Sequence, residues 1–379
     1  MASTRLGRVG IVGAATLKGR ELAEVLAEVP TADVKLLDDE ESLGQLEAVG
    51  DEMSFVQAAS REQFSNLDVV FFASDARFTR KTWQYARAAG ALIVDLSYAL
   101  ADQPGAQIRC AWLDSELGHR MPFMAAQPVQ VVAHPAAMVM ALLLARLGRK
   151  TQIEMAVANV LEPASEQGRR GLDELHQQTV NLLSFQEMPK AVFDSQLAFN
   201  VLPRYGKGSA HNIELTERRV LEHYRAITRV GSGITAAVQH NLLPGDEPPD
   251  SIMIGIVEAG SAPDAGSRRV VPSLAVYQAP IFHAHAVSLF VELRRELTLE
   301  EAAQALQGEH IAVMNEGDEP PTNVSAAGQG EIQLAIRHDG ARRDALWLWA
   351  AADNLKIMAL NAVASAAAAA AMAPKGRIQ

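Results

Sequence analysis

The chain has 379 residues, of which 49% are hydrophobic, and its net charge is -11. This length exceeds what one ordinary core requires and predicts two domains. An acidic surface repels phosphate backbones and anionic lipid, which argues against nucleic-acid or membrane partners. The single cysteine, Cys110, excludes an intramolecular disulfide, and no apolar leader segment follows Met1. Both features predict a cytoplasmic protein.

Short apolar runs alternate with helical patterns in the first third of the chain. Strands are expected at residues 9–12, 34–37, 69–73 and 91–95, and helices at 19–28 and 79–89. This alternation predicts a parallel sheet with helices on both faces, which is the nucleotide-binding type of α/β domain. The domain is assigned to residues 1–138.

The alternation ends after an apolar helix at residues 136–147. Further strands are expected at 152–161, 252–257, 273–278, 286–293 and 345–351, with helices at 171–183 and 214–227. This order predicts an α+β domain with a largely antiparallel sheet at residues 139–352. Two stretches rich in glycine, proline and charge, 243–250 and 259–269, are expected to be surface loops. The alanine-rich end, about residues 353–379, predicts a helix that packs back on the first domain.

A glycine-rich turn follows the first expected strand. It contains Gly10, Gly13 and Gly19, with Thr16 in the position of a further glycine. Such a turn brings the backbone close to a pyrophosphate at the N-terminus of a helix. Thr16 adds a side chain where a phosphate would lie. Many related folds keep such a turn for packing alone, so the sequence leaves both uses open.

Two adjacent carboxylates, Asp38 and Asp39, follow the second expected strand. A carboxylate there accepts hydrogen bonds from a ribose 2′-hydroxyl and repels a 2′-phosphate. If a nicotinamide cofactor binds, NAD is therefore favoured over NADP. The alternative is an ordinary solvated acidic turn.

Seven short motifs occur in the order found in aspartate-semialdehyde dehydrogenases, and the chain resembles that family over nearly its whole length. The motifs are the glycine turn and the segments 71–74, 94–98, 134–135, 165–168, 279–285 and 352–355. The segments 165–175, 196–203 and 217–220 are similar to a paralogous branch of the family that lacks the cysteine nucleophile. The resemblance implies a Rossmann-like NAD(P)-binding domain and a dimerisation domain. It also implies a homodimer formed through the sheet strands 273–278 and 286–293.

The resemblance also assigns the site position by position. The cysteine nucleophile corresponds to Ala137, and Cys110, well upstream on another strand, is not expected to replace it. The acid–base histidine corresponds to His285, and a glutamine near the nucleophile corresponds to Glu162, whose charge is expected to repel an anionic substrate. Two arginines that bind a substrate carboxylate correspond to Gln278 and Leu100, and a phosphate-binding lysine corresponds to Arg219. The expected cofactor contacts are Gly10, Gly13, Thr16, Gly19, Asp38, Ser74 and Asn354, and no metal site is expected.

Three hypotheses about function follow. The leading one is a catalytically silent homologue, a pseudoenzyme, that keeps the dimeric fold and nucleotide binding, because removal of a covalent nucleophile lowers a rate by many orders of magnitude. The second is an NAD-dependent oxidoreductase in which hydride moves without a covalent step and His285 is the acid–base group. The third is a scaffold or interaction protein.

Overall fold

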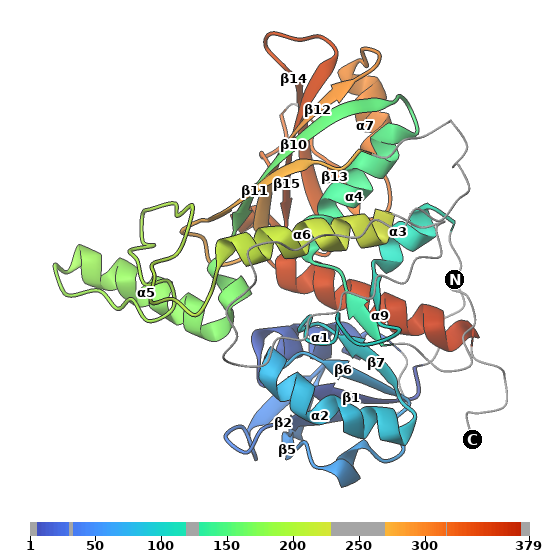
Figure 1. Ribbon diagram of the computed structural model, residues 1–379, viewed down its shortest axis with the longest axis vertical. Helices are drawn as coiled ribbons and strands as arrows, with labels where there is room; N and C mark the ends of the chain where they lie inside the picture. Colours follow the sequence, from blue (N-terminus) through green and yellow to red (C-terminus); the bar gives the residue numbers. More distant parts are fainter. Residues whose placement is uncertain (1–5, 30–32, 119–128, 229–269, 316, 373–379) are drawn as a thin grey trace, which may run out of the picture.

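The computed structural model describes residues 6–29, 33–118, 129–228, 270–315 and 317–372 (Figure 1). The strand expected at 252–257 and the loops expected at 243–250 and 259–269 lie outside the described residues.

The first sheet has seven strands, all parallel, in the order β5-β2-β1-β6-β7-β9-β8. The central strands β1, β6 and β7 are buried along almost their whole length, which explains why they are continuous apolar runs rather than alternating ones. The predicted parallel sheet is confirmed. The strands are β1 (Arg8–Val12), β2 (Asp33–Asp38), β5 (Gln57–Ala58), β6 (Val69–Phe72), β7 (Leu92–Asp95), β8 (Gln107–Arg109) and β9 (Gln130–Val132).

Helix caps define the helices around this sheet. The Thr16 side chain caps α1 by accepting a hydrogen bond from the Gly19 amide, and Asp75 caps α2 in the same way through the Phe78 amide. Helix α2 ends at Gly90, whose φ of 77° is the left-handed conformation that favours glycine. The helices are α1 (Leu17–Ala27), η1 (Arg61–Phe64), α2 (Ala76–Ala89) and α3 (Ala111–Glu116), and a hairpin of β3 (Leu46–Val49) and β4 (Glu52–Phe55) was not predicted.

Among the described residues, the second sheet has six strands in the order β11-β10-β12-β15-β14-β13 and is mixed. The three central pairings are antiparallel, whereas the outer pairs β10–β11 and β13–β14 are parallel. The prediction of a largely antiparallel sheet is therefore confirmed, and the two parallel pairs lie at its edges. The connection from β10 to β11 contains η2, α5 and α6, and the connection from β13 to β14 contains α8, so each is long enough for the chain to return in the same direction. The strands are β10 (Ile153–Glu162), β11 (Ser273–Gln278), β12 (His285–Leu293), β13 (Ile311–Val313), β14 (Ile332–His338) and β15 (Ala345–Ala352).

One face of the second sheet is covered by helices, and the other is partly open. Alternate residues of β10 and β12 are buried in the core that α4, α6 and α7 share with the sheet. The intervening side chains, including Val157 and Phe290, are only half-buried, and Phe290 packs on Trp347 at 5.2 Å between ring centroids. The helices are α4 (Pro135–Gly148), η2 (Ala164–Gln167), α5 (Gly168–Leu183), α6 (Ile213–Thr228), α7 (Leu299–Leu306) and α8 (Asn323–Ala326).

Helix α9 (Asn354–Met372) crosses between the two sheets and packs on α1 (Figure 1). Ile357 belongs to the core of the second domain, whereas Met358 and Ala362 belong to that of the first. Lys356 forms an ion pair with Glu21 of α1 at 2.9 Å. The segment 354–371 is long and apolar enough to cross a membrane, but 56% of it is buried inside the protein, as in many core helices.

Candidate active site

A cluster of ionisable side chains forms where α4 begins. His134 is the N-cap of α4, where its Nδ1 accepts a hydrogen bond from the Ala136 amide at 3.3 Å, and Pro135 follows at the first helical position. The His134 backbone amide donates to Nδ1 of His223 on α6 at 2.9 Å. The His134 ring also lies 5.8 Å from the ring of Tyr98 and 5.5 Å from that of His285. The start of α4 is thus surrounded by aromatic and imidazole rings from both domains.

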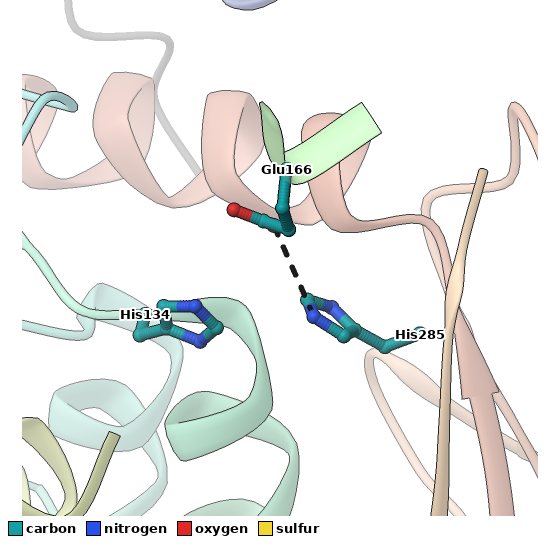
Figure 2. A group of neighbouring side chains, drawn as sticks. All are labelled: His134, Glu166 and His285. Atoms are coloured by element: carbon teal, nitrogen blue, oxygen red, sulfur yellow. Dashed lines mark ion pairs between the residues drawn. The ribbon is translucent and has the colours of Figure 1, made fainter. Parts of the chain in front are cut away.

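His285 and Glu166 face each other beside His134 (Figure 2). Nε2 of His285 lies 3.9 Å from Oε1 of Glu166, and neither ring nitrogen of His285 has a hydrogen-bond partner among the described residues. Glu166 is held by the Asn354 amide, whose Nδ2 donates to Oε1 at 2.9 Å. Burial lowers the pKa of His285, partly opposed by the Glu166 charge. The imidazole is therefore neutral near pH 7 and is placed to exchange a proton with a ligand.

Glu162 ends β10 and is buried beside this group. Its Oε1 accepts a long hydrogen bond from Gln167 at 3.4 Å, and its Oε2 has no partner in the described part of the chain. Burial and the charge of Glu166 raise the pKa of Glu162 to about 8. The raised pKa favours the protonated form of this carboxyl, which weakens the repulsion of an anion that was expected from its charge.

Two cations, one from each domain, lie on the ring of Tyr98. Nζ of Lys18 on α1 and the guanidinium of Arg219 on α6 are each 5.0 Å from the ring centroid. Arg219 and His223, one helical turn apart on α6, both reach this ring. Tyr98 has a positive φ of 63° and Ala284, next to His285, one of 69°, so strained backbone lies on both sides of the cluster.

The cluster is better suited to hydrogen bonding than to a metal ion. Ligand atoms of His134, Glu166 and His285 lie within 4.8 Å of one another, and this donor set is one that zinc accepts. However, Nδ1 of His134 is occupied by the helix cap, which places the ring proton of the neutral form on Nε2. Lys18, Arg219 and the positive end of α4 also oppose a cation. The arrangement therefore favours proton transfer to a ligand.

Ala137 lies at the start of α4 and is fully buried in the second core. Cys110 directly follows β8 and caps α3, rather than lying on a strand. Its thiol is buried and lies 3.5 Å from the Asn361 side-chain oxygen, and burial raises the pKa of the thiol to about 12. Among the described residues there is no other thiol.

The three expected substrate residues do not all meet at the cluster. Arg219 does, through Tyr98. The amide of Gln278 is buried and bonded to Tyr205 and to the backbone of Glu162, so it is committed to the protein beside the cluster. Leu100 is fully buried in the core of the first domain with Phe72 and Trp83, and this side chain does not reach the cluster.

Thr16 and Asp38, which were expected to contact a cofactor, form hydrogen bonds with the backbone of the glycine turn. The Thr16 hydroxyl bonds to the carbonyls of Gly13 and Ala73 and accepts from the Gly19 amide, so it faces the turn itself. Oδ2 of Asp38 accepts from the Ala15 amide at 2.9 Å. A β-carbon at Gly13 would lie 2.3 Å from the Ser74 nitrogen, so the turn needs a glycine there.

The other residues expected to contact a cofactor also pack against or form hydrogen bonds with the protein itself. Gly10 lies inside β1, where a β-carbon would lie 2.6 Å from Leu67, so it serves packing. A β-carbon at Gly19 would lie 2.1 Å from the Gly13 carbonyl oxygen. The Ser74 hydroxyl is 2.9 Å from that of Thr79. Asn354 is fully buried, and its Oδ1 accepts from the Ser165 hydroxyl and the Ala284 amide.

The sequence did not indicate most of the side chains that form the cluster at the start of α4. Lys18, Tyr98, His134, Glu166 and His223 were not singled out. The motifs shared with the family contain Glu166, Tyr98 and His134, so these motifs could have indicated the three residues as members of the site. Lys18 lies inside the glycine-turn motif, but nothing in the sequence indicated that its side chain reaches this cluster. His223 lies outside the motifs, and its proximity to the cluster depends on how α6 packs against the first domain.

Two family models match this chain. Residues 8–132 match the semialdehyde dehydrogenase NAD-binding domain, and residues 265–357 match the semialdehyde dehydrogenase dimerisation domain. A USG-1 protein homolog of Pseudomonas aeruginosa is 28% identical over 361 residues, covering 94% of this chain and 95% of the relative. An aspartate-semialdehyde dehydrogenase of Rickettsia conorii is 23% identical over 369 residues, covering 95% and 96%.

Solved structures share the fold over nearly the whole chain. A probable aspartate-semialdehyde dehydrogenase from Pseudomonas aeruginosa has a TM-score of 0.74 at 26% identity, covering 94% of this chain and 96% of that one. An aspartate-semialdehyde dehydrogenase from Candida albicans with NADP has a TM-score of 0.60 at 14% identity, covering 96% and 97%.

Proposed function

Because the chain belongs to the semialdehyde dehydrogenase family, we propose that it is a nucleotide-binding homodimer that lacks the thioester chemistry of a cysteine dehydrogenase. The observation that carries the proposal is the side chain at the start of α4, where the family resemblance places the nucleophile. Ala137 has no group that attacks a carbonyl.

The other thiol does not compensate. Cys110 is buried, bonded to Asn361 and held with a pKa of about 12, whereas a reactive cysteine needs an accessible thiolate. Gln278 offers no charge to a substrate carboxylate. The phosphorylating oxidation of aspartate semialdehyde is therefore not an activity of this protein.

NAD is the preferred nucleotide. Asp38 and Asp39 lie at the end of β2, where a 2′-phosphate would be repelled. Binding is weak because the Thr16 hydroxyl and the Asp38 carboxylate occupy amides of the glycine turn. The structure of the enzyme from Candida albicans contains NADP. The preference for NAD over NADP is therefore proposed for this chain alone.

The homodimer forms through the open face of the second sheet. The matched dimerisation domain contains β11, β12, β14 and β15. The open face carries the half-buried side chains of Val157, Phe290 and Trp347, whose apolar surface is covered when two copies pair.

Calorimetric titration of the full-length protein with NAD and with NADP tests the nucleotide part. We expect binding of NAD that is weak and stronger than that of NADP. Tighter binding of NADP would reject the role of Asp38, and binding of neither would reject a nucleotide-binding protein.

A second function is favoured by His285, whose two ring nitrogens lack partners among the described residues while Glu166 lies at 3.9 Å. Such a group serves as acid–base catalyst in a hydride transfer without a covalent step. Aldehyde-dependent reduction of NAD that His285→Gln abolishes, with NAD affinity unchanged, would support this alternative. Its absence for a panel of small aldehydes would remove it.

A further inference from the structure

The side chain of Lys18 points away from the glycine turn and toward the loop that follows β7. Lys18 is the second residue of α1, and its Nζ donates to the Leu96 carbonyl at 3.1 Å and lies over the Tyr98 ring. The side chain is partly exposed and extends to the loop after β7, on which the His134 ring also stacks. Lys18 thus brings a primary amine to the edge of the cluster that surrounds the start of α4.

The surroundings of this amine disfavour its charged form. Arg219 lies on the same ring at the same distance, which brings a second cation close to Lys18. Burial lowers the pKa of Lys18, and the Arg219 charge lowers it further, whereas the charge of Glu166 is the main effect that opposes them. A lysine that is desolvated and lies beside another cation is the form in which this side chain becomes a nucleophile.

A second observation points to a ligand next to the amine. The hydroxyl of Tyr98 is buried and has no hydrogen-bond partner in the described part of the chain, and neither has Oε2 of Glu162. A buried hydroxyl without a partner is costly, and a carbonyl oxygen would satisfy it as an acceptor. The protonated Glu162 carboxyl is a second donor in the same cluster.

We propose that Lys18 is a nucleophile that forms an imine with small aldehydes beside the ring of Tyr98. The nitrogen lone pair attacks the carbonyl carbon, a C–N bond forms, and the oxygen takes up a proton to give a carbinolamine. Loss of the C–O bond then releases one water and leaves the C=N double bond, so that no redox partner is needed. The substrate class, an aldehyde, rests on the proposed function, whereas the reactivity of the amine does not.

Reductive trapping on the full-length protein tests this inference. The protein is incubated with butanal and cyanoborohydride near neutral pH, and the butyl adducts are located by peptide mass mapping. The chain has eight lysines, so each site is resolved separately. We expect the Lys18 adduct to form several-fold faster than the adduct of the exposed Lys81, because the lowered pKa leaves more of the Lys18 amine neutral near neutral pH.

Three variants test whether the fast adduct forms at Lys18 and depends on the neighbouring cation. Lys18→Arg should remove the fast adduct, the matched control Lys81→Arg should leave it, and Arg219→Gln should slow it several-fold by removing the neighbouring cation. A Lys18 adduct that forms no faster than that of Lys81 would overturn the proposal. The calorimetric titration with NAD is independent of this trapping, so failure of one does not imply failure of the other.

Discussion

The residue at position 137 decides whether the site can form a covalent intermediate. Ala137 lies at the start of α4 with no exposed surface. The cluster at His134, the N-cap of this helix, also contains His285 and Glu166, which supply an imidazole and a carboxylate but no thiol. Under the proposed function, the site therefore holds groups that can move protons and no thiol that could form an acyl intermediate.

Restoring the thiol alone should not restore a dehydrogenase. Ala137→Cys would place a sulfur in a fully buried position, while Gln278 still offers no charge to an anionic substrate. We expect no reduction of NAD or NADP with aspartate semialdehyde and phosphate, measured at 340 nm, whereas ordinary enzymes turn over about 1–1000 times per second. Robust turnover by the single variant would show that the rest of the site is intact.

The native thiol should be almost inert. With a pKa of about 12 against about 8.5 for a free cysteine, Cys110 should react with a thiol reagent about three orders of magnitude more slowly than an exposed cysteine. Full reaction in denaturant is the control. Rapid labelling of the native protein would reopen Cys110 as a nucleophile.

At the scale of elements, the turn before α1 shows what the sequence could and could not predict. The glycines and Thr16 predicted a turn between β1 and α1, and the turn is there. The direction of the Thr16 hydroxyl was not predictable, because it depends on the carbonyl of Ala73 at the end of β6. The sequence predicted a largely antiparallel second sheet but not which of its pairs are parallel, since alternation within a strand does not indicate its direction.

Thr16→Gly should tighten NAD binding. The change frees the Gly19 amide and opens the turn, and we expect about a tenfold gain in affinity, or about 1.4 kcal/mol. The loss of the cap should cost only a few tenths of a kcal/mol. Thr298→Gly, which removes the equivalent cap from α7, is the matched control and should leave NAD affinity unchanged. Unchanged or weaker binding in Thr16→Gly would contradict the blocking role of Thr16.

At the scale of the whole molecule, two sheets with separate cores are joined by α9. Both the parallel first sheet and the terminal helix were predictable, because apolar strands alternate with helices and alanine strongly favours a helix. The meeting of Lys18 on α1 with Arg219 on α6 was not, because it depends on how the two domains pack.

Phe290→Arg should separate the dimer. Phe290 lies on the open face of the second sheet beside Trp347, and a charge there would be buried without a partner. We expect light scattering to report a monomer at micromolar concentration. Phe55→Arg, on the exposed β4 of the first domain, is the control and should remain dimeric. A wild-type monomer, or a dimeric Phe290→Arg variant, would exclude this interface.

The most direct test of the central claim is the rate of NADP or NAD reduction by the purified wild-type protein with aspartate semialdehyde and phosphate. With alanine at the position that the family resemblance assigns to the nucleophile, and Cys110 buried, we predict no reduction above the protein-free rate. Turnover within a few orders of magnitude of ordinary enzymes would contradict the account, because it would require a nucleophile that neither Ala137 nor Cys110 provides.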